Sequence, residues 1–311
     1  MCRTGWWMLG GMDADIGLVL PSREVVMWGG GEMDGLLDAA ERAERDGFDS
    51  VWVGESPLAR PRPDPLLVLA ALAARTRRVR LGTAVLLPLL RHPLTLAHGL
   101  ATLDRLAGGR LVVGLAPGAD VPGTHAELAA VDRPSGRRVG DLMDTVARWR
   151  ELWKGEVRPG PVRPEGPPLW LGAQGPRMLA LTGERFDGWM PFSPTPEHYA
   201  RGLASVRGAA AAAGRDPGAL VAAAYVTVAV DDDPARAAGA LDEYMTAYYG
   251  QPASVMSRIQ ACHAGTLSSA ADWIGSYVAA GASHVLVRFA STGLTGYPPA
   301  ARELRERLAA R

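Results

Sequence analysis

The chain has 311 residues, of which 48% are hydrophobic, so it is long enough to bury a large core. Its 33 basic and 33 acidic residues cancel, and neither sign forms the long block typical of proteins that bind nucleic acids or anionic membranes. The two distant cysteines, Cys2 and Cys262, predict neither a disulfide scaffold nor a zinc site, and no apolar run reaches the ~20 residues of a transmembrane helix. These features favour a cytoplasmic protein that acts on a small molecule.

The first residues do not resemble a structural element. Residues 1–13 lack the apolar centre of a signal peptide, and Met12 is a second candidate start of the chain. We therefore treat residues 1–13 as an N-terminal tail and residues 14–311 as one domain.

Short apolar runs alternate along the chain with longer amphipathic segments, which is the pattern of a parallel sheet built from βα units. Eight strands with intervening helices in this length predict a (β/α)8 barrel, an α/β fold, rather than a doubly wound sheet. The predicted strands are Ile16–Leu20, Val51–Gly54, Val79–Leu86, Leu111–Ala116, Leu169–Ala173, Gly188–Phe192, Ala223–Val230 and His284–Phe289.

Helical segments separate these strands. Prolines at the expected first turns and glycines at the expected ends, such as Gly47, Gly108 and Gly281, support the assignment. The predicted helices are Met33–Asp46, Pro65–Arg75, Pro93–Leu106, Arg137–Trp153, Pro196–Ala213, Pro234–Tyr249, Ser268–Ala280 and Glu303–Ala310.

Loop lengths are unequal. Segments that follow strands are long, for example Pro21–Glu32, Glu55–Asp64 and Pro117–Gly136, whereas the turns that precede strands are short. In barrels of this kind the chemistry lies on the loops after the strands, so we expect the site at the carboxyl ends. The Gly29–Gly31 run within the first loop is either a flexible connector or part of a closing lid.

Four stretches carry a family resemblance: "DGFDSVWVGES" (46–56), the segment from "DPLLVLAALAAR" to "GRLVVGLAPG" (64–118), "PLWLGAQGPRMLALTGERFDGWMPFSPTPEHY" (168–199) and "VAAGASHVLVRF" (278–289). They resemble the bacterial-luciferase-like monooxygenase superfamily. The resemblance implies a barrel oxidoreductase, a monooxygenase or reductase that uses coenzyme F(420) or FMN, in homodimers. "GPRML" and "DGWMP" are closer to the F(420) branch, so we expect F(420) rather than FMN.

The turn Gln174-Gly175-Pro176-Arg177 follows the fifth predicted strand. A glycine that admits an anion, the free amides of a helix start and an arginine are suited to a phosphate. The resemblance assigns these four residues to the cofactor phosphate. The alternative is an ordinary turn with a solvated arginine.

Further cofactor contacts follow from the resemblance. It places a bulge with a non-proline cis peptide behind the cofactor ring at Thr83, Ala84 and Val85, and a plain buried strand is the alternative. Gly118 is suited to close approach of backbone to the ring. Ser56 stands where F(420)-dependent relatives often have a histidine.

Two acids are the candidate proton donors. Glu55 matches the position of an aspartate in the relatives, and burial at a barrel mouth would raise the pKa of its carboxyl group toward neutrality. Its alternative role is structural, either capping a helix or pairing with Arg60 or Arg62. Asp120 is displaced by one position from an acid of the relatives, because Ala119 occupies the matching place.

The pattern of histidines and cysteines predicts no metal site. Two rival functions remain at this point. One is a barrel that has lost cofactor chemistry and acts as a binding or accessory protein, which the missing histidine and displaced acid suggest. The other is a cofactor-independent hydrolase or lyase, for which the sequence offers only isolated acids.

Overall fold

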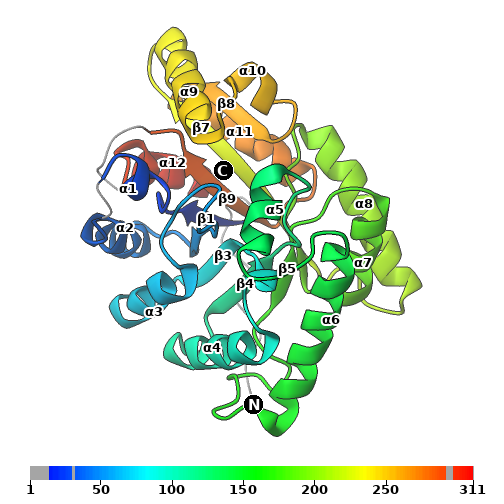
Figure 1. Ribbon diagram of the computed structural model, residues 1–311. Coiled ribbons are helices and arrows are strands. Elements are labelled where there is room, and N and C mark those ends of the chain that lie inside the picture. The colour runs from blue at the N-terminus through cyan, green and yellow to red at the C-terminus, as the bar shows by residue number, and fades with distance from the viewer. Residues whose placement is uncertain (1–13, 30–31, 292–296, 311) are drawn as a thin grey trace.

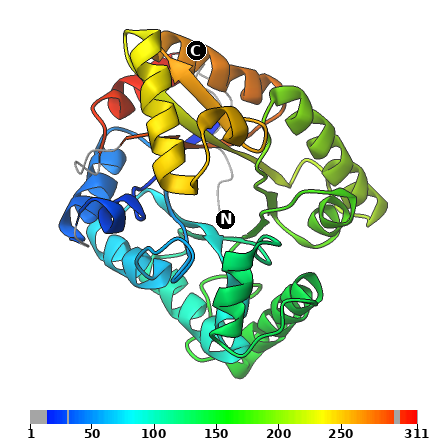
Figure 2. The ribbon, with the colours of Figure 1, turned by 45° about the horizontal axis from the view of Figure 1, so that its top comes forward.

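The computed structural model describes residues 14–29, 32–291 and 297–310. The expected tail, residues 1–13, lies outside the described residues, as do Gly30 and Gly31. Eight parallel strands close into a ring, and helices surround that ring (Figures 1 and 2), which confirms the predicted (β/α)8 barrel. The strands of the ring are β1 (Asp15–Val19), β2 (Ser50–Val53), β3 (Arg80–Leu86), β4 (Leu111–Leu115), β5 (Leu169–Leu171), β6 (Gly188–Trp189), β7 (Val221–Val230) and β9 (His284–Phe289).

One strand was not expected. β8 (Ala261–Gly265) stands outside the ring and pairs in parallel with Val226–Val230 of β7. It takes the edge of β7 that β6 leaves open, because β6 pairs only with Val221 and Ala222. The sequence of β8, Ala-Cys-His-Ala-Gly, contains no β-branched residue, so its composition does not indicate a strand.

The helices cover the outside of the barrel, and the predicted ones are all present. Proline opens six of the described α-helices, and glycine follows several with positive φ, as expected. The segment 117–136 is not a plain loop, because it contains α5. Among the described residues no helix is long and apolar enough to cross a membrane. The helices are α1 (Glu24–Met27), α2 (Asp34–Arg45), α3 (Pro65–Arg75), α4 (Pro93–Leu106), α5 (Pro122–Ala129), α6 (Arg138–Glu151), α7 (Pro176–Arg185), α8 (Pro196–Ala212), α9 (Pro234–Tyr249), α10 (Ala253–Met256), α11 (Leu267–Ala279) and α12 (Ala300–Ala309), with the short turns η1 (Pro88–Leu90) and η2 (Leu152–Glu156).

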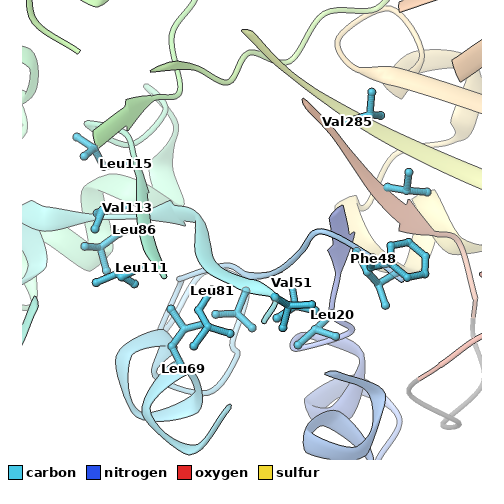
Figure 3. Close-up of a cluster of buried hydrophobic side chains, with 14 of the residues drawn as sticks. Leu20, Phe48, Val51, Leu69, Leu81, Leu86, Leu111, Val113, Leu115 and Val285 are labelled. Atoms are coloured by element: carbon cyan, nitrogen blue, oxygen red, sulfur yellow. The ribbon is translucent and has the colours of Figure 1, made fainter. Parts of the chain in front are cut away.

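The largest apolar cluster lies between the outer faces of the strands and the helices. Figure 3 shows part of it, where Leu69 of α3 lies beside Leu81 of β3. Burial of such side chains contributes about 1.5–3 kcal/mol each, so this layer holds the helices on the barrel.

The interior of the barrel has its own core, dominated by Trp52 and Trp170, whose ring centroids are 5.1 Å apart. Glycines make room for these indoles. A Cβ on Gly82 would lie 2.1 Å from the Trp52 ring, and one on Gly188 would lie 2.5 Å from that of Trp170. Large side chains on some strands and glycines on others therefore fill the barrel, and the carboxyl end is left for the site.

Candidate active site at the mouth of the barrel

A cavity of about 770 Å³ opens at the carboxyl ends of the strands. This volume is within the range of cofactor and substrate pockets. Most strands of the ring, or the loops that follow them, contribute to its wall. The contributions include Glu55 and Ser56 after β2, Ala84 and Val85 of β3, Ala116 and Gly118 after β4, Gly172 and Gln174 after β5, Met190 and Phe192 after β6, Tyr225 of β7 and Arg288 of β9.

The wall formed by β3 contains the expected bulge. The Ala84–Val85 peptide bond is cis, and the register between β3 and β4 shifts between Thr83 and Leu86. Both Ala84 and Val85 line the cavity, whereas Thr83 is fully buried and its hydroxyl donates to the Gly114 carbonyl at 2.6 Å. Thr83 therefore shapes the bulge, and the two residues after it form the surface that a ligand would contact.

The expected phosphate turn lies at the rim. Gly175 has φ of 78° and immediately precedes α7, whose first-turn amides have no intrahelical partner. A Cβ at Gly175 would contact nothing within 4 Å, so glycine is required there by the backbone angle and not by a close neighbour. Arg177 is exposed beside this helix start, and Gln174 reaches the cavity, where its amide donates to the Phe192 carbonyl.

Glu55 lines the cavity with a side chain that is only 4% exposed. One carboxylate oxygen, Oε2, accepts a hydrogen bond from the Leu87 amide at 2.6 Å, and Oε1 pairs with Arg91. Burial raises the pKa of Glu55, although the charge of Arg91 opposes the change. The sequence suggested Arg60 or Arg62 as a structural partner of Glu55, and that prediction is wrong. The partner is Arg91, which lies just before α4.

Ser56 is held by a residue that the sequence did not single out. Its hydroxyl donates to Glu127 Oε1 at 2.6 Å and accepts from the Arg60 amide at 2.8 Å. Glu127 of α5 is itself buried and accepts from the amides of Leu58 and Ala59 at 3.1 and 3.0 Å. Both hydrogen bonds of the Ser56 hydroxyl thus hold the loop after β2 in place. Glu127 was missed because its helix was read as a loop.

The other expected acid lies outside the cavity. Asp120 has a side chain 76% exposed, pairs with His125 at 2.8 Å and Arg138 at 3.1 Å, and is not among the described residues that line the wall. The hydrogen bond from His125 and the charge of Arg138 lower the pKa of Asp120. Both features make it a poor proton donor. Gly118 does line the wall, with φ of 82°.

A cluster of arginines and tyrosines on the opposite side of the cavity was also missed. It consists of Arg23, Arg60, Arg62, Arg288, Tyr225, Tyr248 and Tyr249, all of which line the cavity. The available signals were an arginine within the apolar run "HVLVRF" and a Tyr-Tyr pair at the end of a helix. The unexpected β7–β8 extension carries part of this wall, since α9 packs on β8 and ends at Tyr249 (Figure 1).

No group of His, Cys, Asp and Glu side chains in the described part of the chain could hold a metal ion. The cavity offers an apolar surface on β3, a helix start at the rim, the two buried acids Glu55 and Glu127, and a basic wall. This combination is suited to a flat ring system that carries anionic substituents.

Comparison with known proteins identifies relatives. A model of the luciferase-like monooxygenase family matches residues 14–293. The chain is 31% identical over 238 residues to a 5,10-methylenetetrahydromethanopterin reductase of Methanolobus tindarius, and the alignment covers 70% of this chain and 69% of that protein. It is 32% identical over 224 residues to an F(420)-dependent glucose-6-phosphate dehydrogenase of Kineococcus radiotolerans, with 65% and 66% covered. The matched segment thus spans about two thirds of the length of these relatives.

A solved structure shows the same fold. The monooxygenase RslO1 of Streptomyces bottropensis matches 95% of this chain and 97% of its own with a TM-score of 0.76, at 23% identity.

Proposed function

The chain belongs to the luciferase-like monooxygenase family, and from that premise we propose that its cavity binds coenzyme F(420) for hydride transfer to or from a small organic substrate. The protein is an oxidoreductase that depends on F(420) or a flavin. We propose further which of these cofactors the protein uses, where the cofactor lies and which residues act beside it.

The observation that carries the proposal is the bulge in β3 that places Ala84 and Val85 in the cavity wall. The family resemblance places a bulge of this kind behind the cofactor ring, and here the bulge presents two small apolar side chains to the cavity. A flat ring can pack against such a surface, and the cavity volume of about 770 Å³ leaves space for a second ligand on the exposed face.

The rim supplies a suitable place for the cofactor phosphate. The free amides at the start of α7 and the exposed Arg177 beside them provide partial and full positive charge, respectively. Gln174, which lines the cavity and precedes Gly175 in the chain, connects this position to the cavity. We propose that Gln174, Gly175, Pro176 and Arg177 hold the phosphate, while Gly118 and Ser56 shape the wall near the ring.

The chemistry supplied by the bound cofactor is transfer of a hydride. The protein orients the reactants, excludes water and handles the proton that accompanies the hydride. Glu55 is the candidate for the proton because it is a buried acid in the wall and its pKa is raised by burial. Its Oε atoms are held by Leu87 and Arg91, so the carboxyl group has a fixed orientation. We retain Asp120 only as a surface residue.

The preference for F(420) over FMN rests on the curated relative from Kineococcus radiotolerans, which is F(420)-dependent and aligns over 65% of the chain. The motifs "GPRML" and "DGWMP" point the same way. FMN remains the alternative, because the two branches share the barrel and the bulge.

The proposal is tested by titrating the purified chain with F(420) and with FMN and following absorbance and fluorescence. We expect F(420) to bind at micromolar concentration and FMN at least tenfold more weakly. The reverse preference would replace F(420) by FMN. Binding of neither would overturn the enzyme interpretation and favour an accessory protein.

Three further properties concern the whole protein: its domain bounds, its location and its oligomeric state. We infer one domain from residue 14 to residue 311, a cytoplasmic location and a homodimer, by analogy with the family. Light scattering of the purified chain would test the dimer, for which a mass near twice 32.9 kDa is expected.

A further inference from the structure

Four guanidinium groups converge on two tyrosine rings at one side of the cavity. The centroid of Tyr248 lies 4.4 Å from Cζ of Arg23, 5.8 Å from that of Arg62 and 4.6 Å from that of Arg288. Cζ of Arg60 and Cζ of Arg288 lie 4.9 and 5.3 Å from the centroid of Tyr249. Like charges are thus held close together, and the electron-rich ring faces compensate part of their repulsion.

Arg288 occupies the deepest position in this cluster, at 3% exposure. It donates from Nε and Nη2 to the Thr227 hydroxyl and from Nη1 to Tyr249 Oη at 2.9 Å, and both of these partners are neutral hydroxyl groups. Burial of an arginine without a carboxylate costs considerable free energy, so proteins usually place a counter-charge beside it.

The described carboxylates do not pair directly with these arginines. None of the ion pairs among the described residues involves Arg23, Arg60, Arg62 or Arg288, whereas Arg91 and many surface arginines are paired. Glu24 is the acid that acts electrostatically on Arg62, and it is already bonded to the Tyr244 hydroxyl.

Arg23 has an unsatisfied donor, because its Nε is buried without a hydrogen-bond partner among the described residues. Burial is the main cause that lowers the pKa of Arg23, and the charges of Arg62 and Arg60 act in the same direction against the opposing effect of Tyr248. Burial also opposes the charged forms of Arg62 and Arg288, but the neighbouring tyrosines raise the pKa of both.

The cluster lies across the barrel from the proposed phosphate turn. Its members come from β9, β7, α9 and the loops after β1 and β2, while Gly175 follows β5, which is four strands from β1 in the ring. A cofactor whose phosphate is at Gly175 and whose ring packs on Ala84 and Val85 therefore leaves this wall to the other reactant.

We propose that Arg23, Arg60, Arg62 and Arg288, with Tyr248 and Tyr249, form a subsite for an anionic group of the substrate, a carboxylate or a phosphate ester. This inference rests on the proposed function, because the cofactor position assigns the wall to the substrate. The guanidinium groups form charge-assisted hydrogen bonds to the anion, and the tyrosine hydroxyls orient it. Specificity for an acidic substrate follows, because a neutral analogue would leave the buried Arg288 and the half-buried Arg23 and Arg62 without a counter-charge.

The test uses the full chain saturated with whichever cofactor binds, titrated with glycerol 3-phosphate, glutarate and neutral glycerol in a calorimeter. The comparison is between wild type, Arg60→Gln, Arg60→Lys and the surface control Arg307→Gln on α12. Arg60 is exposed, so its replacement does not threaten the fold. Loss of one charge-assisted contact should weaken anion binding about tenfold or more, the lysine variant should retain much of it, and the control should equal wild type.

The subsite is supported if Arg60→Gln binds the anions more weakly while its affinity for the cofactor stays constant. The anion that binds wild type more tightly, glycerol 3-phosphate or glutarate, identifies the chemical class of the ligand. Equal affinity of glycerol 3-phosphate and glycerol, or unchanged anion affinity in Arg60→Gln, overturns it. A parallel loss of cofactor affinity in Arg60→Gln also overturns it, because the cluster would then hold the cofactor.

Failure of the proposed function gives a different result. If no cofactor binds wild type, the anion titrations are repeated on the free chain with Arg177→Ala as comparator. A loss of anion binding confined to Arg60→Gln keeps an anion site in this wall even then, whereas a loss confined to Arg177→Ala removes it.

Discussion

At the amino-terminal end of the barrel, Ser50, Trp52 and His284 are hydrogen-bonded to one another. At the carboxyl end, Arg23, Arg60, Arg62 and Arg288 line a cavity, and the ion pairs of the described residues include none of the four. At the closed end, Ser50 Oγ lies 2.8 Å from His284 Nε2 and accepts from Trp52 Nε1 at 2.7 Å. Asp15 pairs with Arg80 beside His284. The open end has the cluster around Arg288.

This comparison assigns the amino-terminal end of the barrel to stability and the carboxyl end to binding. Although Asp15, His284 and Ser50 adjoin one another, His284 and Ser50 are fully buried under two tryptophans and no ligand can reach them. They serve as a polar layer of the core. The arginines at the other end have only neutral partners in the contacts described above, and the proposed anionic ligand would supply their counter-charge.

The largest effect is expected at the closed end. Trp52→Ala should lower the free energy of unfolding by about 3–5 kcal/mol, because the neighbouring glycines cannot fill the space left by the indole. Phe192→Ala, at the open end where the ring is 42% exposed, should cost less than about 1 kcal/mol. Urea denaturation measures both, and equal losses would contradict the separation of roles.

Glu55→Gln should reduce turnover about 100-fold while cofactor affinity changes little, because the amide cannot supply the proton. In wild type, activity should fall as pH rises through the pKa of Glu55, which burial raises against the effect of Arg91. Steady-state kinetics against pH, with a separate cofactor titration, checks this. Unchanged turnover would make Glu55 a structural partner of Arg91.

Arg177→Ala should weaken cofactor binding about tenfold, the value of one charge-assisted contact. Gly175→Val should weaken it more, because φ of 78° is strained for valine. Arg185→Ala, at the other end of α7, is the matched control and should bind like wild type. If the control loses as much affinity as Arg177→Ala, the helix start is not the phosphate site.

Acid should weaken the closed end specifically. Burial lowers the pKa of His284, so its contribution to stability is lost as pH falls below the unfolded value near 6.5. Burial opposes ionisation of Asp15, but His284 and Arg80 lower its pKa to about 2, so its contribution is lost between about 3.8 and 2. Urea midpoints at pH 7 and 5 should differ more for wild type than for His284→Asn. The same difference in both would exclude His284.

The smallest effect concerns the acid that proved to be exposed. Asp120→Asn should leave turnover and cofactor affinity within about twofold of wild type, because surface ion pairs contribute little. A loss comparable to that of Glu55→Gln in the same assay would restore Asp120 to the site.

Much of the barrel could be predicted from sequence, because each strand of the ring is a short apolar run between turn residues. Many helices also begin at a proline or end before a glycine. β8 could not, since its Ala-Cys-His-Ala-Gly sequence forms a strand only because β7 offers a free edge. α5 was hidden within a segment rich in glycine and proline.

The candidate site was predictable where neighbours in the sequence form it. The turn at Gly175 and the bulge at Ala84–Val85 are contiguous segments with a family pattern. The arginine cluster was not predictable, because it unites Arg23, Arg60, Arg62 and Arg288, residues that only barrel closure brings together. Local sequence likewise gave no reason to pair Glu55 with Arg91 or Ser56 with Glu127.

The most direct test of the account is to fill the cavity and measure cofactor binding. Ala116 lines the wall beside the bulge, so Ala116→Trp should occupy the space assigned to the ring. Titration of wild type with F(420) should give one bound cofactor per chain, and the folded Ala116→Trp variant should bind at least 100-fold more weakly. Equal binding by the two proteins would contradict the account, because the cofactor would then lie outside this cavity.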